Sequence, residues 1–203
     1  EKLDELDKNE PGQNAYRLKA AQYRTIAEQF VPHLFDHMPF YFETGAVASY
    51  GDGHYQRGGR HANGWLLERN THIIRDRYPE EWKTFCHMQS DKLCLTCGPF
   101  FDAEHTPIPM TKIFKVGLSG VHAEAVDALS RCTTKEERDF VEAAIVGLEA
   151  LKLIADKFAA EARRRLESET DPENIRNFKL IADTAARVPW NPPKTFYEGM
   201  ATL

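Results

Sequence analysis

The sequence predicts a mainly α-helical protein with a loop-rich segment at about 32–120. Three observations support this class. Apolar residues recur at helical spacing along the second half of the chain, Thr or Asp residues stand where helices would begin, and strict apolar/polar alternation is scarce. Prolines and glycines punctuate the segment at about 32–120, which is typical of loops.

Up to residue 129 the sequence predicts only short helices. An apolar stripe between Tyr16 and Phe30 indicates a helix that ends before Pro32, because the residue preceding a proline disfavours helical geometry. We expect further short helices at about 70–77, 80–85 and 121–129.

The longest predicted helix runs over about 135–167. Thr134 and Glu137 form a capping box at its start, in which each side chain accepts the backbone N–H of the other residue. The polar turn at 168–171 ends it. One helical face carries Phe140, Ala144, Leu148, Leu151, Ala155, Phe158, Ala162 and Leu166.

A second helix follows this turn directly. Asp171 is placed to cap it and Pro172 to open it, because proline suits the first position of a helix. Because a short turn joins the two helices, we expect them to pack antiparallel. The apolar stripe of the second helix consists of Ile175, Phe178, Ala182 and Ala185.

A second capping box, at Thr195 and Glu198, lies close to Leu203. A helix of so few residues is marginal in water by itself, because nucleation costs more than a few hydrogen bonds return. We therefore expect residues 1–203 to be a single partial domain, loop-rich at 32–120 and helical at 121–203, that further polypeptide completes.

Composition predicts a soluble globular protein. A net charge of -5 and a pI near 5.9 argue against a nucleic-acid partner, because phosphate binding needs clustered Lys and Arg. No apolar run reaches the roughly 18 residues needed to cross a membrane. We expect no membrane association and a cytoplasmic location. Three of the four cysteines lie between Cys86 and Cys97, which is not a pattern of secreted disulfide frameworks.

The order of motifs from Asp171 to Met200 resembles that of a known family. The proline-opened helix is followed by Val188-Pro189, Trp190, and Pro192-Pro193-Lys194-Thr195-Phe196 with Glu198. Paired prolines keep the residues before a helix extended. Because proline has no N–H group, they leave no amide donor without a partner. This order resembles the glycyl radical enzyme family, to which pyruvate formate-lyase belongs.

Two further stretches are similar to segments of that family. The Ala-rich helix at 140–165 resembles the long helix that precedes the terminal motif. The run from His105 to Pro109, followed by Gly117-Leu118, is similar to a His-Thr segment that leads into a Gly-Leu turn. The resemblance covers about 104–203.

The resemblance implies a fold and a chemistry. Family members are built on an α/β barrel, of which this chain would supply the N-terminal helical layer. A glycyl radical, installed by an S-adenosylmethionine-dependent activating enzyme, generates a thiyl radical that takes hydrogen from a small polar or carboxylated substrate. We expect lyase, dehydratase or decarboxylase activity in a homodimer. Neither the radical glycine nor the thiyl cysteine is identifiable in this chain, which we expect to be catalytically incomplete and to bind no cofactor itself.

His105 is the strongest candidate for a substrate-binding residue within the resemblance. Its imidazole can donate a hydrogen bond to a substrate hydroxyl or carboxylate, and Asp102 can orient the ring. The alternatives are a histidine that satisfies a loop backbone and an aspartate that caps a turn.

A glycine-rich loop supplies a second candidate. Arg57, Arg60 and His61 can hold an anionic substrate through charge-assisted hydrogen bonds. The loop lacks the order of a nucleotide-binding fingerprint. Its alternative role is an exposed loop whose basic groups are solvated.

A metal site is the competing hypothesis from another class. Cys86, His87, Cys94 and Cys97 are the residue types that form a structural zinc or iron–sulfur site. Adjacent residues do not readily point at one ion, and no second C-x-x-C motif follows, so buried free thiols are the plainer interpretation. The chain would then be a stand-alone helical protein.

Overall fold

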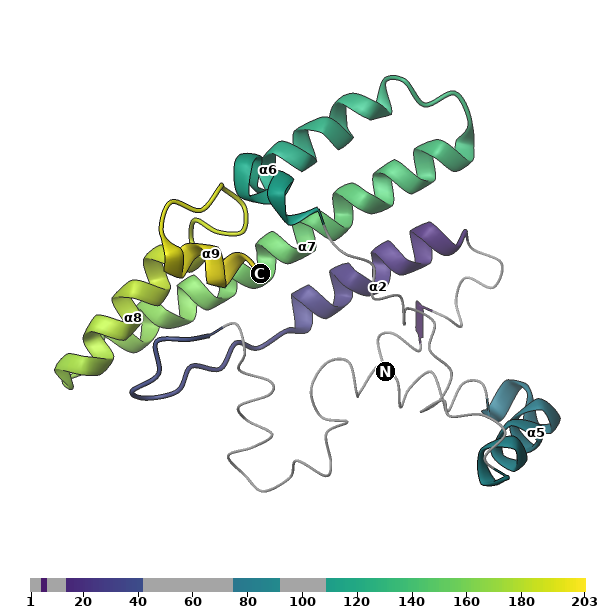
Figure 1. Ribbon diagram of the computed structural model, residues 1–203, viewed down its shortest axis with the longest axis horizontal. Coiled ribbons are helices and arrows are strands. Elements are labelled where there is room, and N and C mark those ends of the chain that lie inside the picture. The colour runs from purple at the N-terminus through teal and green to yellow at the C-terminus, as the bar shows by residue number, and fades with distance from the viewer. Residues whose placement is uncertain (1–4, 7–13, 42–74, 92–108) are drawn as a thin grey trace. The chain divides into compact units, whose positions relative to one another are not determined.

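The computed structural model describes residues 5–6, 14–41, 75–91 and 109–203, and these are mainly helical (Figure 1). None of the described residues lies in a strand, which confirms the predicted class. The helices are α2 (Ala15–Gln29), α5 (Pro79–Ser90), α6 (Met110–Leu129), α7 (Lys135–Leu166), α8 (Pro172–Ala185) and α9 (Phe196–Thr202).

The chain divides into two compact units. The first unit, Glu1–Phe42 with Ile108–Leu203, contains α2, α6, α7, α8 and α9, and the second, Glu43–Pro107, contains α5. The expectation of one partial domain over residues 1–203 stays a prediction.

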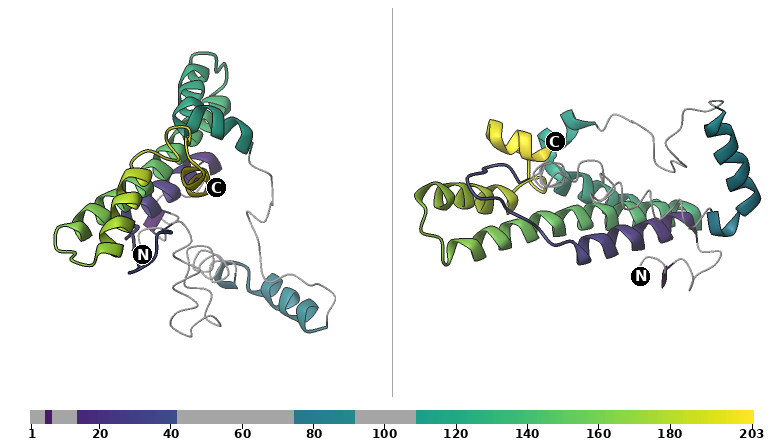
Figure 2. Two further views of the ribbon diagram at one scale, coloured as in Figure 1. Left: turned by 60° about the vertical axis from the view of Figure 1, so that its left-hand side comes forward. Right: turned by 90° about the horizontal axis from the view of Figure 1, so that it is seen from below.

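The first unit is built around α7. Helices α2, α6 and α8 each pack against it, and Figure 2 shows α2 and α8 lying along its length. Because Arg17 pairs with Glu142 and Arg24 pairs with Glu149, α2 runs parallel to α7. Helix α8 returns antiparallel to α7 after a short turn, as predicted (Figure 1).

An apolar core joins α7, α8 and the segment that follows α2. The ring of Phe158 lies 5.1 Å from that of Tyr41 and 5.3 Å from that of Phe30, centroid to centroid. Burying each large apolar side chain stabilises the fold by about 2 kcal/mol. The core cluster consists of Leu34, Tyr41, Phe158, Ala159, Ala162, Phe178, Ile181, Ala182 and Ala185.

The predicted starts of α7 and α8 are confirmed. The Thr134 hydroxyl accepts the Glu137 N–H at 3.1 Å, and the Glu137 carboxylate accepts the Thr134 N–H at 3.1 Å. The Asp171 carboxylate accepts the N–H groups of Glu173 and Asn174 at 2.8 and 3.0 Å. Local pairs of this kind satisfy the amides that a helix start leaves without partners.

Two predicted boundaries before residue 130 are wrong. Helix α6 begins at Met110, eleven residues before the predicted start at Val121, so the loop-rich segment does not extend to 120. The sequence pattern does not predict its first two turns, because the non-helical conformation of Gly117 interrupts the helix. Helix α5 extends the predicted element at 80–85 to Ser90. Residues 75–77 are helical, while 70–74 lie outside the described residues.

The predicted stripe of α7 is buried only in part. Ala155, Phe158 and Ala162 are in the core, whereas Phe140 and Leu151 are 54% and 50% exposed. The reason is that different neighbours cover different stretches of this long helix. Across the described residues, no helix has both the length and the apolar character required to span a membrane.

Candidate functional site

Most of the predicted site residues lie outside the described residues. Their positions are neither confirmed nor contradicted, and they stay predictions. These residues are Arg57, Arg60, His61, Cys94, Cys97, Asp102 and His105.

Cys86 and His87 lie on α5. The Cys86 thiol is free and its residue is exposed. Successive side chains on a helix point about 100° apart, so these two do not converge on one ion. Among the described residues, no three His, Cys, Asp or Glu side chains gather as metal ligands would.

A close backbone contact in the first unit joins α6 to the turn after α8, and we call it the Gly117 junction. The Leu118 N–H donates to the Pro189 carbonyl at 2.9 Å, and the Ser119 N–H donates to the Trp190 carbonyl at 2.8 Å. Gly117 has φ 67° and ψ 177°, a region open essentially to glycine alone. A Cβ atom here would lie 2.3 Å from the Trp190 carbonyl oxygen. The junction therefore requires glycine for both conformation and space.

Polar side chains surround the indole of Trp190. The His122 ring lies 5.3 Å from the Trp190 ring, centroid to centroid, and the Lys152 ammonium lies 5.8 Å from the ring centre. The His122 Nε2 is 3.4 Å from a carboxylate oxygen of Glu149. These contacts join α6, α7 and the turn after α8, so they fix the direction in which α6 leaves the junction.

Glu198 holds the start of α9 in place. Its carboxylate accepts the Thr195 N–H at 3.2 Å and the Arg187 Nε–H at 2.9 Å, and the Arg187 guanidinium also donates to the Pro192 carbonyl. Desolvation alone would raise the Glu198 pKa, but hydrogen bonds from the Lys194 N–H and from Arg187 hold it below its ordinary value. We call this arrangement the Glu198 clasp.

The clasp and the paired prolines set the direction of the chain into α9. The Tyr197 hydroxyl donates to the Pro39 carbonyl, and burial raises the pKa of Tyr197 to about 12. Ala201 packs against the core cluster. One face of α9 is thereby attached to the rest of the first unit.

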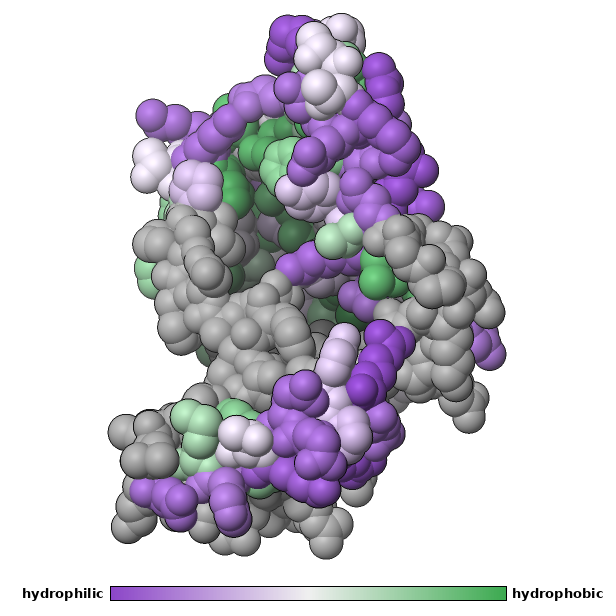
Figure 3. Space-filling model, turned by 90° about the vertical axis from the view of Figure 1, so that its right-hand side faces the viewer, coloured by the Kyte–Doolittle hydropathy of each residue, from purple (hydrophilic) through white to green (hydrophobic). Residues whose placement is uncertain are grey.

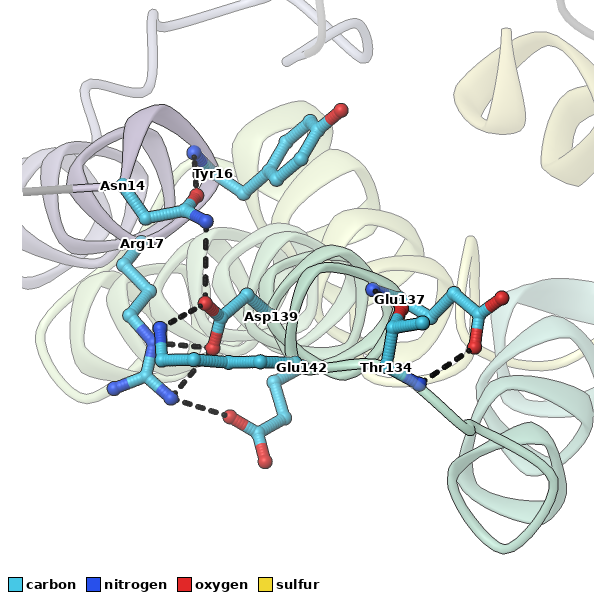
Figure 4. A network of polar contacts seen from close by, with 8 residues as sticks. Asn14, Tyr16, Arg17, Thr134, Glu137, Asp139 and Glu142 are labelled. Carbon is cyan, nitrogen blue, oxygen red and sulfur yellow. Dashed lines mark hydrogen bonds and ion pairs between the residues drawn. The ribbon is translucent and has the colours of Figure 1, made fainter.

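A buried carboxylate ties α2 to α7 (Figure 4). Asp139 is 0% exposed, and its oxygens accept from Arg17 Nε at 2.6 Å, Lys135 Nζ at 2.7 Å and Asn14 Nδ2 at 3.1 Å. The hydrogen bond from Lys135 is the main reason that the Asp139 pKa lies below its ordinary value, and Arg17 acts in the same direction against the effect of burial.

A groove between α6 and α7 encloses about 430 Å³. Val121, Ala125, Phe140 and Val141 supply apolar lining, and Glu124 lies among them. Figure 3 faces the end of the first unit that carries the turn between α6 and α7, and it shows apolar side chains in a recess bordered by hydrophilic ones.

The contacts among the described residues therefore hold helices and turns of the backbone in place. The Gly117 junction and the Asp139 pairs join elements that are distant in sequence, and the Glu198 clasp joins the turn after α8 to the start of α9. Sequence reasoning missed the special conformation of Gly117 and the burial of Asp139. The quoted Gly117-Leu118 pair was a signal for the first, whereas nothing beside Asp139 in the sequence marks it as buried.

Comparison with known proteins agrees with this architecture. A family model described as pyruvate formate lyase-like matches residues 60–203. The isethionate sulfite-lyase of Nitratidesulfovibrio vulgaris is 34% identical over 95 residues, which cover 44% of this chain and 12% of that protein. The isethionate sulfite-lyase of Bilophila wadsworthia is 32% identical over 94 residues, 43% of this chain and 11% of that protein.

Solved structures show the same fold over almost the whole chain. A protein of Roseburia inulinivorans studied for 1,2-propanediol dehydration has a TM-score of 0.67 and 17% identity, covering 98% of this chain and 28% of its own. The B12-independent glycerol dehydratase of Clostridium butyricum has a TM-score of 0.68 and 17% identity, covering 98% of this chain and 30% of its own.

A third structure, a glycyl radical enzyme from Archaeoglobus fulgidus, has a TM-score of 0.64 and 16% identity, covering 98% of this chain and 30% of its own. The chain thus spans less than a third of each of these structures and about an eighth of the lyases. The family match takes in α6 to α9 and, with them, the Gly117 junction and the Glu198 clasp. The chain belongs to the pyruvate formate lyase-like family of glycyl radical enzymes, of which it represents a helical portion.

Proposed function

We propose that this chain is the N-terminal helical part of a glycyl radical enzyme and is catalytically incomplete alone. One observation carries the proposal: the fold covers 98% of this chain but only 28% of the propanediol-dehydrating structure. In the described residues, the Gly117 junction and the Glu198 clasp fix the direction of the backbone, which suits a part that attaches to further polypeptide.

The reaction we propose is loss of a small group from a small hydroxylated substrate. The matched proteins include isethionate sulfite-lyases, a glycerol dehydratase and a hydroxyproline dehydratase. Each name describes the removal of water or sulfite from a small polar molecule. This common feature favours a lyase or dehydratase over an enzyme that breaks a carbon–carbon bond.

We assign the substrate contacts of this chain to two segments. His105, oriented by Asp102, would bind a substrate hydroxyl or carboxylate, and Arg57, Arg60 and His61 would bind an anionic group. The glycyl radical would reside elsewhere in the enzyme, where it supplies hydrogen abstraction, and an S-adenosylmethionine-dependent enzyme would install it. The enzyme would work as a cytoplasmic homodimer under anaerobic conditions.

The test uses the reading frame that encodes this chain. Reading on beyond Leu203 should reveal a mid-chain cysteine loop and a glycine motif near the end. The complete protein, activated anaerobically, should give the electron paramagnetic resonance doublet of a glycyl radical. It should then consume one of glycerol, 1,2-propanediol, isethionate or trans-4-hydroxy-L-proline.

The 203 residues alone provide the control. We expect no radical signal and no product from them under the same conditions. Turnover by this chain alone would contradict the proposal, and so would a complete protein that acquires no radical. Replacement of His105 by Ala in the complete protein should raise KM for the substrate while the radical signal stays intact.

A further inference from the structure

Helix α9 presents two different faces. The inner face is attached: the Tyr197 hydroxyl donates to the Pro39 carbonyl, and Ala201 packs against the core cluster. The outer face carries Phe196 and Met200, which are 87% and 39% exposed, and Leu203, which follows directly after the helix, is 74% exposed. Phe196 and Met200 are four residues apart and share one face of α9, so with Leu203 they make an apolar stripe. We call it the outer stripe.

The helix that carries these exposed side chains is held in place by hydrogen bonds at its start. Both bonds of the capping box are present at Thr195 and Glu198, and the Glu198 clasp ties the start of α9 to Arg187. The Gly199 N–H donates to the Thr195 carbonyl at 2.9 Å, which closes the first turn. The outer stripe is therefore presented in a fixed orientation.

A fixed apolar stripe in water indicates a partner surface. Leaving a large apolar side chain in water forgoes the stabilisation that its burial would contribute. Apolar residues four apart on one helical face are also part of the pattern by which an amphipathic helix lies in an apolar groove. Phe40, which is 46% exposed, stacks on the Tyr197 ring at 6.0 Å and adds apolar surface beside the helix.

The comparison structures are much longer than this chain. Each contains this fold as at most 30% of its own chain, so most of each folded enzyme has no counterpart among these residues. We propose that the outer stripe is the docking face for the remaining polypeptide of the same enzyme, with Phe196 as the main anchor. This inference rests on the proposed function. The partner surface it requires is apolar and recessed enough to take an aromatic ring.

Methionine oxidation in the complete protein tests the inference. Dilute hydrogen peroxide and mass spectrometry give the oxidation rate of Met200 in the native protein and in the same protein unfolded in urea. Docking should make Met200 about tenfold slower to oxidise in the native protein, because oxidation then requires local opening. If the oxidation rates of Met200 in the native and the unfolded protein agree within about twofold, the inference is overturned. Met200 would then be as accessible to peroxide in the native protein as in the unfolded one.

Two matched variants locate the effect. Phe196→Asp should raise the native oxidation rate of Met200 severalfold, whereas Val31→Asp should leave it unchanged. Val31 is the appropriate control because it is an equally exposed apolar residue, at 82% against 87% for Phe196. If Phe196→Asp lowers the yield of folded protein, Phe196→Ala serves instead. Equal responses to the Phe196 and Val31 variants would contradict the role of Phe196.

Two further readouts separate the possible outcomes. Protection of Met200 that disappears on dilution would mean that a second copy covers the stripe, and this would overturn the inference. The glycyl radical signal of the same sample reports on the proposed function separately. A radical signal with an unprotected Met200 would leave the proposed function standing and reject only the docking face.

Discussion

Gly117 is the residue on which the geometry of the first unit depends most directly. Its φ of 67° is combined with backbone atoms of Trp190 and Asn191 at the position where a Cβ would lie. These neighbours are main chain and cannot rotate away. A substitution would therefore have to break the two hydrogen bonds that join α6 to the turn after α8.

We predict that Gly117→Ala lowers the free energy of unfolding by on the order of 3 kcal/mol, because it combines backbone strain with a steric clash. The measurement is urea denaturation followed by circular dichroism. Gly199→Ala is the matched control, since a Cβ at this helical glycine meets nothing within 4 Å. That variant should be stabilised by about 0.5–1 kcal/mol, because alanine is the better helix former. A Gly117→Ala protein as stable as the wild type would disprove the junction.

Asp139 makes the stability of the first unit depend on pH. Its pKa is lowered in the folded state, so the ionised carboxylate stabilises the fold above the unfolded value near 4. The contribution is lost as the pH falls through the lowered folded pKa. Asp139→Asn should accordingly show a smaller loss of melting temperature between pH 6 and about pH 3 than the wild type.

Asp183→Asn controls for the general effect of removing a carboxylate, because Asp183 is an exposed residue of α8. Its melting temperature should follow the wild-type pH dependence. If Asp139→Asn did the same, the contacts from Arg17 and Lys135 would contribute nothing that depends on ionisation.

At the scale of single elements, the two capping boxes allow a direct comparison. Both have the same hydrogen bonds, but α7 has 32 residues and α9 has 7. A short helix depends more on each terminal interaction because it has few internal bonds to lose.

Thr195→Ala should remove about 1 kcal/mol of capping energy, and hydrogen exchange throughout α9 should become roughly fivefold faster. Thr134→Ala should accelerate exchange only in the first turn of α7. Mass spectrometry of exchanged peptides distinguishes the two patterns. Unchanged exchange in α9 would show that the Glu198 clasp and the contacts of the inner face hold the helix without its cap.

These elements also show how far the sequence could predict the fold. The starts of α7, α8 and α9 were predictable because donors and acceptors lie within four residues of each other. The start of α6 was missed because the conformation of Gly117 is fixed by Trp190, which is remote in sequence. Asp139 was missed for the same reason, since its partners Asn14 and Arg17 come from another helix. The predicted substrate contacts lie outside the described residues.

At the scale of the whole first unit, stability is distributed unevenly. The pair α7–α8 shares the apolar core, whereas α2 is also held by polar contacts at its two ends. Asp139 holds the first end. At the other end, the Lys157 ammonium donates to the carbonyls of Glu28 and Phe30 at 2.6 and 2.9 Å. Removing the contacts at both ends should therefore release α2 while α7 and α8 stay packed.

The combined variant Asp139→Asn with Lys157→Met should expose α2 to limited proteolysis while peptides from α7 and α8 stay protected. Lys152→Met, which removes an i,i+4 ion pair with Asp156 on the surface of α7, is the control and should change nothing at α2. Simultaneous cleavage of α2, α7 and α8 would mean that the unit opens as a whole.

The Gly117 junction fastens the beginning of α6 to the turn after α8, so residues 117–190 make a closed ring of polypeptide. After a single cleavage within this ring, its two parts are still joined at the junction. A protease nick between Ser130 and Thr134, where α6 gives way to α7, would leave both fragments bound to each other along α7 and at the junction. The nicked protein should therefore run as one species on a native gel and come apart only in denaturant.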